Sequence, residues 1–510
     1  MKTKSLFRVS LIKLEWLLVV TLQFITASLF SKDLSPLDYG LKSARDGIEC
    51  FNILYKTHTD AIAKGVSVDY SGIGRIDLII PPSAKSIPLA ESTDFKGTEF
   101  YVRNTEKDIY LFSLVTKSES VKVEKGYLSR TPSRIPTLSG KNVLLGIEDA
   151  NPWVEKRSGY NYGATRKDLL VIKDGQMHNV PIMAYNNASS DPKCQAYPYR
   201  TNRKVICGIR LSRSSDSSKK TFLLKVEGQY NLSISDVTII TPNNAMNGDS
   251  AIDIINSASL SLENIRIEGT YSQKDKYGYG ISMNNVYDVS FNQLYAHGDW
   301  GVFGTNNTQN VSLINCDINR FDIHCYGRDV TFKKCVFRNL YNQFSSVYGT
   351  IRFVQCSFID CVPVLLEYSY NAYTGFDLVF EKCYYKVSDA LGKNCIVNVG
   401  YLNEEKNSRA ELMEKCWPNV RINGMQIDLP SSVDKVYLMH LRKKVSYTRA
   451  LGYASEFSLR KITVNGNKKG KRVELQLSNY EIPIQHKIKV TQKRNIHPNL
   501  SIKDNISNKR

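Results

Sequence analysis

One short pattern recurs as VSLINCDI at residues 311–318, VTFKKCVF at 330–337 and IRFVQCSF at 351–358. Each copy alternates apolar and other residues, inserts two mostly polar residues, and then alternates again. Four more copies of the pattern fit at residues 232–239, 260–267, 289–296 and 378–385. One column of the aligned copies contains Val237, Ile265, Leu294, Cys316, Cys335, Cys356 and Cys383.

This column advances by 19 to 29 residues from copy to copy. Each step accommodates one coil of three short strands and three turns, in which a coil buries its apolar face only against its neighbours. A leucine-rich repeat has a similar period, but it needs a strict Leu and Asn frame and a helix in every repeat, which are not visible here. The sequence therefore predicts an all-β, right-handed parallel β-helix, a solenoid whose core contains the four cysteines of the column as free thiols.

The remainder of the chain divides around these repeats. Residues 1–30 combine a basic start with an uncharged apolar stretch from Trp16 to Phe30, which is typical of a signal peptide with cleavage between Ala27 and Lys32; an N-terminal anchor is the alternative. Residues 31–150 are expected to hold an N-terminal capping helix, within residues 37–64, and the first coils. Residues 151–400 form the β-helix with the candidate site, and residues 401–510 the last coils and a basic tail.

The composition narrows the choice of partner. Eleven cysteines are an odd number, which argues against a complete disulfide framework in an exported chain. The formal charge is +19, and the segment from residue 417 to the end has 19 Lys and Arg against 6 Asp and Glu. A basic surface attracts anionic polymers. Export, together with the absence of an Arg-rich helix or zinc-finger spacing, favours a polysaccharide, including an acidic one, over nucleic acid. We expect no membrane span after signal removal, no metal and no cofactor.

The candidate chemistry lies in the run Arg320-Phe321-Asp322-Ile323-His324-Cys325. Because side chains alternate along a strand, Phe321 and Ile323 are expected to face the core, and Arg320, Asp322 and His324 to line up outside. Stacked coils lie about 4.8 Å apart, so residues of the neighbouring coils belong to the same surface. These are His297, Asp299, Trp300 and Phe303 from the preceding coil and Tyr341 from the following one.

The run around Arg320, Asp322 and His324, with its lead-in Asp299-Trp300-Gly301-Val302-Phe303-Gly304, resembles the Arg-x-Asp-x-His coil of some phage appendage and tailspike-like proteins. These proteins and their bacterial relatives belong to the pectate-lyase-like β-helix superfamily. The segments at residues 93–97 and 162–168 resemble earlier landmarks of the same group, so the likeness covers about residues 37 to 390. It implies a fold but no single reaction, because the superfamily includes lyases, glycoside hydrolases, esterases and non-catalytic binders. The calcium-binding Asp cluster of pectate lyases and the adjacent aspartates of polygalacturonases are not found in this sequence.

Two classes of function follow from these residues. In a polysaccharide lyase or glycoside hydrolase, Asp322 is the general base or nucleophile, His324 or Asp299 is the proton donor, and Arg320 neutralises an acidic sugar. Trp300, His297, Phe303 and Tyr341 then bind substrate. In a non-catalytic glycan-binding or appendage-type structural protein, the same groups only hold the glycan. An ordinary solvent-facing ion pair is the structural alternative for Arg320 and Asp322. Either function places the protein in the periplasm, at the cell surface or in the medium.

Overall fold

The computed structural model describes most of the chain between residues 33 and 507. The described ranges are 33–89, 92–152, 165–182, 184–185, 188, 191–240, 251–268, 279–297, 301–324, 326–338, 341–345, 347–366, 376–388, 394–399, 418–433, 435–441, 456–466, 473–478, 482–483, 489–492, 500–503 and 506–507. The predicted signal peptide, Asp299, Trp300 and most of the basic tail lie outside them.

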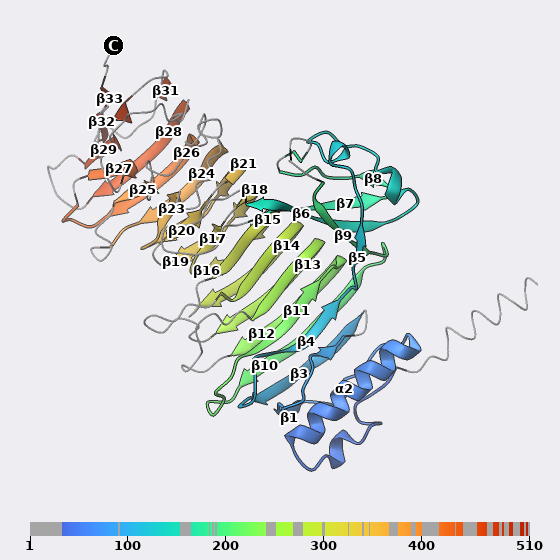
Figure 1. Ribbon diagram of the computed structural model, residues 1–510. Coiled ribbons are helices and arrows are strands. Elements are labelled where there is room, and N and C mark those ends of the chain that lie inside the picture. Colours follow the sequence, from blue (N-terminus) through green and yellow to red (C-terminus); the bar gives the residue numbers. More distant parts are fainter. Residues whose placement is uncertain are drawn as a thin grey trace, which may run out of the picture.

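Parallel strands wind into a long stack of coils that begins near β1 and ends near β32 (Figure 1). Among the described residues, 26 strands join in this one parallel sheet. The early strands are β1 (Arg75–Ile79), β2 (Ile87–Pro88), β3 (Thr93–Arg103), β4 (Ile109–Val115), β10 (Lys204–Arg213), β11 (Thr221–Glu227) and β12 (Tyr230–Ile240). The middle strands are β13 (Ile252–Glu268), β14 (Ile281–His297), β15 (Val302–Ile314), β16 (Asp317–Ile318), β17 (Phe321–His324), β18 (Gly327–Lys333), β19 (Val336–Arg338), β20 (Tyr341–Phe344), β21 (Val347–Val354), β22 (Ser357–Ile359), β23 (Val362–Leu366) and β24 (Phe376–Lys386). The late strands are β25 (Cys395–Val399), β26 (Asn419–Leu429), β27 (Lys435–Leu441), β28 (Glu456–Gly466), β29 (Val473–Ser478), β31 (Lys489–Gln492) and β32 (Leu500–Lys503), with β30 (Ile482–Pro483) and β33 (Ile506–Ser507) pairing separately.

Each coil has a first, a second and a third strand, separated by corners. The coil of β17, β18 and β19 shows this most clearly, and β13 and β14 run through all three positions with bends. The register is the one that the sequence pattern predicts: Ile252 pairs with Ile281, Ile281 with Val302, and Val302 with Phe321. The first strands therefore stack on one another and form one face of the stack. We call the outer side of β4, β11, β17, β20 and the first parts of β13, β14 and β15 the first-strand face.

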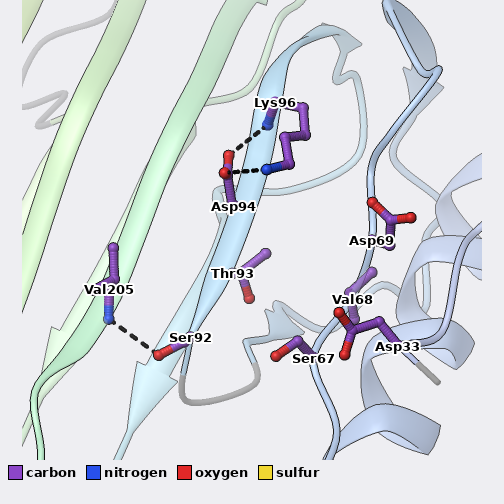
Figure 2. Close-up of a pocket in the computed structure, with 9 residues that line it drawn as sticks. All are labelled: Asp33, Ser67, Val68, Asp69, Ser92, Thr93, Asp94, Lys96 and Val205. Atoms are coloured by element: carbon purple, nitrogen blue, oxygen red, sulfur yellow. Dashed lines mark hydrogen bonds and ion pairs between the residues drawn. The ribbon is translucent and has the colours of Figure 1, made fainter. Parts of the chain in front are cut away.

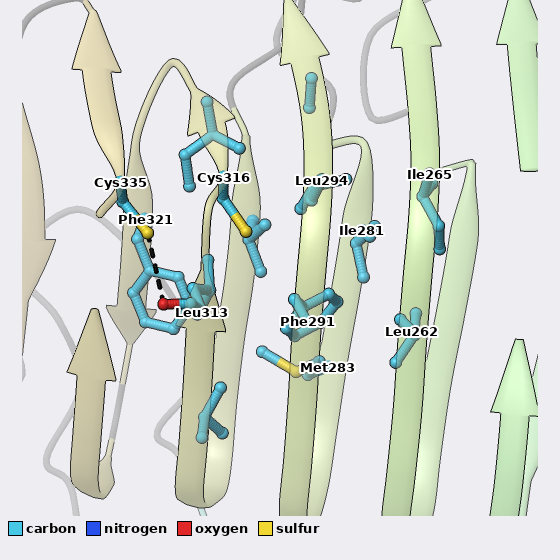
Figure 3. Packing of buried hydrophobic residues seen from close by; sticks show 14 of the residues in the cluster. Leu262, Ile265, Ile281, Met283, Phe291, Leu294, Leu313, Cys316, Phe321 and Cys335 are labelled. Atoms are coloured by element: carbon cyan, nitrogen blue, oxygen red, sulfur yellow. Dashed lines mark hydrogen bonds between the residues drawn. The ribbon is translucent and has the colours of Figure 1, made fainter. Parts of the chain in front are cut away.

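The predicted column of apolar residues and cysteines is confirmed. Cys316, Cys335, Cys356 and Cys383 are free thiols with at most 3% exposure, within the main hydrophobic core. Figure 3 shows Cys316 and Cys335 in the interior, in line with Leu294 and Ile265, and the Cys335 thiol donates to the carbonyl oxygen of Leu313 at 3.3 Å. Short side chains at this position let successive coils pack closely without the geometry that a disulfide needs.

The corner before this column uses left-handed backbone. Its residues include Asp236, Asn264, Gln293, Asn315, Lys334, Gln355, Lys382 and Lys461, with φ between 51° and 58°. Asn and Asp adopt this conformation at a lower cost than other non-glycine residues. Their side chains also bridge coils, since Asn264 Nδ2 donates to Asp236 Oδ1 at 2.6 Å. The two mostly polar residues of the repeated pattern are therefore the bend between the second and third strands.

A helix lies at the start of the stack, where the sequence predicts one. After the short 3₁₀ turn η1 (Leu41–Ser43), α2 (Gly47–Lys64) begins at Asp46, whose carboxylate accepts from the backbone N–H of Glu49. Its buried residues Phe51 and Leu54 belong to the same core as β1. The helix itself lies beside β1 at the start of the stack (Figure 1). His58 is fully buried, its Nε2 lies 2.8 Å from the hydroxyl of Tyr70, and burial lowers its pKa to about 3. That this helix protects the end of the stack remains a prediction.

A separate antiparallel sheet interrupts the winding between β4 and β10, which the sequence did not predict. It contains β5 (Glu119–Val121), β6 (Val143–Pro152), β7 (Thr165–Lys173), β8 (Gln176–Met177) and β9 (Lys193–Pro198), with the 3₁₀ turns η2 (Lys125–Tyr127) and η3 (Pro136–Leu138). We call these elements the inserted sheet. It has its own hydrophobic core and lies beside β13, β14 and β15 (Figure 1). The predicted domain boundary at residue 150 falls within β6.

None of the helices in the described part of the chain has both the length and the apolar character needed to cross a membrane.

Candidate functional site

The residues from Arg320 to His324 alternate as predicted, but Arg320 and Asp322 are not exposed. Phe321 and Ile323 point into the core and are fully buried. Asp322 and Arg320 lie on the opposite side of the strand, yet their exposed fractions are 0% and 3%. The expectation that both line a solvent-facing surface is therefore wrong, because side chains from the neighbouring coils cover them. His324 remains half-buried.

Arg320 and Asp322 form an ion pair in which every carboxylate oxygen is engaged. Arg320 Nε donates to Asp322 Oδ1 at 2.8 Å, and a second guanidinium N–H donates to Oδ2. The backbone N–H of Gln343 donates to Oδ1 at 3.2 Å, and the hydroxyl of Tyr279 donates to Oδ2 at 2.6 Å. Burial opposes the charged form of Arg320, but the charge of Asp322 outweighs it and raises the pKa of the guanidinium. The pair is thus a buried structural unit.

Aromatic rings surround this ion pair on the first-strand face. The rings of Tyr279 and Phe303 stack with centroids 4.7 Å apart, and Phe303 meets His324 edge to face at 5.0 Å. The guanidinium carbon of Arg320 lies 4.7 Å from the centroid of the Tyr341 ring. We call Tyr279, Phe303, His324 and Tyr341 the aromatic group. All four are partly exposed, so they present ring surface to solvent while the charges lie beneath.

The predicted residue His297 belongs to a second cluster, around the corner of the coil. Its Nε2 lies 3.1 Å from Asp317 Oδ1, and Arg338 donates to both oxygens of the same carboxylate at 2.9 and 3.0 Å. Burial works against the charged form of Asp317, but hydrogen bonds from His297 and Arg338 keep its pKa below the ordinary value. His297 and Asp317 are 24% and 30% exposed, so this imidazole and carboxylate are accessible to a ligand.

Glycine 301 fixes the corner between the two clusters. Its φ is 97°, and a Cβ at this position would lie 1.9 Å from the carbonyl oxygen of Arg320. The same carbonyl accepts from the backbone N–H of Val302 at 3.1 Å. Only glycine allows this close approach of the two coils, which holds Arg320 in place directly before β17.

Sequence reasoning identified part of this arrangement. It placed Arg320, Asp322, Phe303 and Tyr341 together, and the structure confirms that they meet. Asp299 and Trp300 lie outside the described residues, so their positions stay predictions. Tyr279 and Asp317 were missed. The signal for Tyr279 was its place three residues before Ser282, since Trp300 has the same offset from Phe303 in the next coil.

A small cavity of about 210 Å³ lies elsewhere, near the start of the stack (Figure 2). Its lining combines Asp33, Asp69 and Asp94 with Lys96, whose amino group lies 2.6 Å from Asp94 Oδ2. It is far along the stack from β17. Within the described residues, no cluster of His, Cys, Asp and Glu could hold a metal ion.

Solved structures with a similar fold are tailspike proteins of bacteriophages. The tailspike protein gp49 from Pseudomonas phage LKA1 has a TM-score of 0.52 and 12% identity, covering 87% of this chain and 82% of that one. The tailspike gp61 of Pseudomonas phage phi297 has a TM-score of 0.47 and 12% identity, with coverages of 88% and 82%. The gp54 tailspike of Acinetobacter baumannii bacteriophage AP22, solved with a capsular saccharide, has a TM-score of 0.35 and 11% identity, with coverages of 94% and 80%. No protein-family model and no curated protein sequence matches the chain.

These comparisons define the class of fold. The chain is a right-handed parallel β-helix, as the repeated pattern predicts. Phage tailspikes share this fold, which agrees with the resemblance of the coil around Arg320, Asp322 and His324.

Proposed function

We propose that this protein binds a polysaccharide on its first-strand face, at the aromatic group. The observation that supports it is the stacked pair of Tyr279 and Phe303 above the buried Arg320–Asp322 ion pair. Partly exposed rings suit the C–H face of a pyranose, whereas the hydroxyl of Tyr341 suits its hydroxyl groups. The basic start and the apolar segment within residues 1–30 are typical of a signal peptide, which supports export of the protein. We therefore place the polysaccharide outside the cytoplasm.

In this proposal Asp322 is a positioning residue. A general base or nucleophile must come within hydrogen-bond reach of the substrate, but Asp322 has no exposed surface and already accepts four hydrogen bonds. Its carboxylate instead holds the Tyr279 hydroxyl, and through it the ring that stacks on Phe303. The guanidinium of Arg320 is already engaged with Asp322. We therefore assign attraction to an acidic polymer to the overall charge of +19 rather than to this guanidinium.

Phe303→Ala tests the proposal. We expect affinity for the bound polysaccharide to fall about tenfold, because the variant removes the ring on which Tyr279 and the sugar stack. Binding would be measured by affinity electrophoresis and calorimetry with polygalacturonate, hyaluronan, dextran and mannan, which include acidic and neutral chains. Tyr101→Ala is the matched control, since Tyr101 is also half-buried and stacks on an arginine, Arg75, on another side of the stack. Equal binding by wild type and Phe303→Ala would contradict the proposal.

Cleavage of the polysaccharide is a second candidate function, favoured by the accessible His297–Asp317 pair. An imidazole beside a carboxylate can transfer a proton, and it lies one corner away from the aromatic group. Incubation with the same panel would show new reducing ends for a hydrolase, and ultraviolet absorbance of unsaturated sugars for a lyase. We expect His297→Gln to abolish either product while leaving binding intact. If wild type forms no product from a chain that it binds, cleavage is ruled out for that chain.

A further inference from the structure

The first-strand face contains a second aromatic arrangement that resembles the one above Asp322. The rings of Tyr110 on β4 and Phe222 on β11 stack with centroids 4.7 Å apart and an interplanar angle of 30°. The hydroxyl of Tyr110 donates to the carboxylate of Asp253 on β13. Burial and this carboxylate raise the pKa of Tyr110, so the phenol stays a donor. Tyr110, Phe222 and Asp253 are all partly exposed.

The two arrangements share a tyrosine and an aspartate at equivalent positions. A tyrosine stands three residues before a serine of the first strand: Tyr110 before Ser113, and Tyr279 before Ser282. Its ring stacks on a phenylalanine of the next coil, and its hydroxyl reaches an aspartate two coils on. The phenylalanines differ in position, because Phe222 pairs directly with Tyr110 whereas Phe303 pairs with Ser282, three residues after Tyr279.

The register shows that both arrangements lie on one line. Ser113 pairs with Lys225, Lys225 with Asp253, Asp253 with Ser282, and Ser282 with Phe303. Tyr110 and Tyr279 are therefore three coils apart on the same face, which corresponds to about 14 Å at the spacing of neighbouring strands. The nearest rings of the two pairs, Phe222 and Tyr279, are two coils apart, about 10 Å, so the two pairs suit separate sugar units.

The surface between the two ring pairs is polar and partly exposed. Ser282 and Asn284 lie there, each with a side chain that can exchange hydrogen bonds with hydroxyl groups. The inserted sheet borders this face at the neighbouring corner, where the hydroxyl of Tyr197 accepts from Asn256 Nδ2 at 2.7 Å. Asn285 also donates to the carbonyl oxygen of Asp168 at 3.2 Å. The face is thus bounded along one side.

We infer that Tyr110 and Phe222 form a second sugar subsite, and that the ligand is a linear polysaccharide lying along the axis of the stack and contacting both ring pairs. This inference rests on the proposed binding function and adds the direction of the chain and its minimum length. The two ring pairs hold separate sugar units, and the polar surface between them contacts the hydroxyl groups of the connecting units.

The inference is tested with oligosaccharides of graded length. They are cut from the polysaccharide that the wild-type protein binds among polygalacturonate, hyaluronan, dextran and mannan. For chains long enough to span both subsites, Phe222→Ala should lower the affinity about tenfold. For the shortest fragments that still bind at Phe303, the same variant should leave the affinity unchanged. Phe303→Ala should weaken both. Val115→Ala is the control for lost apolar surface, since Val115 is exposed on the same strand as Tyr110.

The outcomes separate the two proposals. If Phe222→Ala binds long chains as wild type does while Phe303→Ala is weakened, the second subsite is wrong and the binding function stands. If neither variant is weakened, both proposals fail. Should Phe222→Ala unfold, as judged by its thermal midpoint, Phe222→Leu keeps the packing but lacks the ring, and the same loss for long chains is expected of it.

Discussion

At the scale of single residues, Asp322 shows that facing away from a core and being exposed are different properties. Strand periodicity places its side chain outside, and it does lie outside. Its exposure is nevertheless zero, because Tyr279 comes from two coils away and covers it. A polar residue in this position acts through its bonds to other residues rather than through contact with solvent.

We predict that Asp322→Asn destabilises the protein. The isostere keeps the shape but removes the charge that balances the buried guanidinium of Arg320, and such a loss costs about 3 to 5 kcal/mol. Urea unfolding of the variant and wild type measures it. The control is Asp77→Asn. In the wild type, Arg75 donates to Asp77 at the same two-residue spacing, but both side chains are more than half exposed. A loss at Asp322 as small as that at Asp77 would contradict the buried, charged state of Arg320.

The sequence predicts local relations between residues well and distant ones poorly. Phe303, Asp322 and Tyr341 could be grouped because they belong to neighbouring coils whose register follows from the apolar pattern. Tyr279 bonds to a residue 43 positions away, and Asp317 meets His297 across a coil. Those contacts depend on the direction of long side chains, which periodicity does not determine.

At the scale of elements, the inserted sheet is what sequence reasoning missed. Its strands β6 and β7 contain runs of adjacent apolar residues, such as Leu169–Ile172, and such runs do not distinguish antiparallel from parallel pairing. The clearest difference is in its core, which includes Leu145, Leu170 and Ile172 but none of the stacked cysteines. The helix α2, by contrast, was predicted, because a period of 3.6 residues differs from that of every neighbouring strand.

The carboxyl group of Asp168, on β7 of the inserted sheet, should make stability depend on pH. Burial raises its pKa to about 7, although Ile182 and Tyr185 donate hydrogen bonds to it. The folded state therefore holds the proton more tightly than the unfolded state does. The resulting stabilisation is complete below about pH 4 and is lost as the pH rises through about 7, by up to about 1.4 kcal/mol per pH unit.

Asp168→Asn should remove this dependence, so that wild type loses more stability than the variant between pH 4 and pH 7. Urea unfolding at several pH values measures the difference. Asp174→Asn, a change at an exposed position of the same sheet, should follow wild type. A wild type that gains stability relative to Asp168→Asn over this range would show that the buried carboxyl group is ionised in the folded state.

At the scale of the whole molecule, the core thiols report whether the stack is intact. Among the described cysteines, only Cys50 and Cys207 are half-buried, and the rest are buried. Burial raises the pKa of Cys383 to about 11, which further suppresses the reactive thiolate. We predict that maleimide labels none of Cys316, Cys335, Cys356 and Cys383 in the native protein, as located by peptide mass spectrometry. Rapid native labelling of Cys335 or Cys356 would contradict the packed column, whereas labelling in urea should include all four.

The corners of the coils have a consequence for how such a protein changes over generations. The copies of the pattern are 19 to 29 residues apart, yet their register is continuous, so differences in length are absorbed at the corners. The inserted sheet occupies one such corner, between β4 and β10. An insertion or deletion there leaves the hydrogen bonds of the stack in place. Lineages can therefore exchange whole surface modules while the winding persists, and shared ancestry would leave more trace in the path of the backbone than in the sequence.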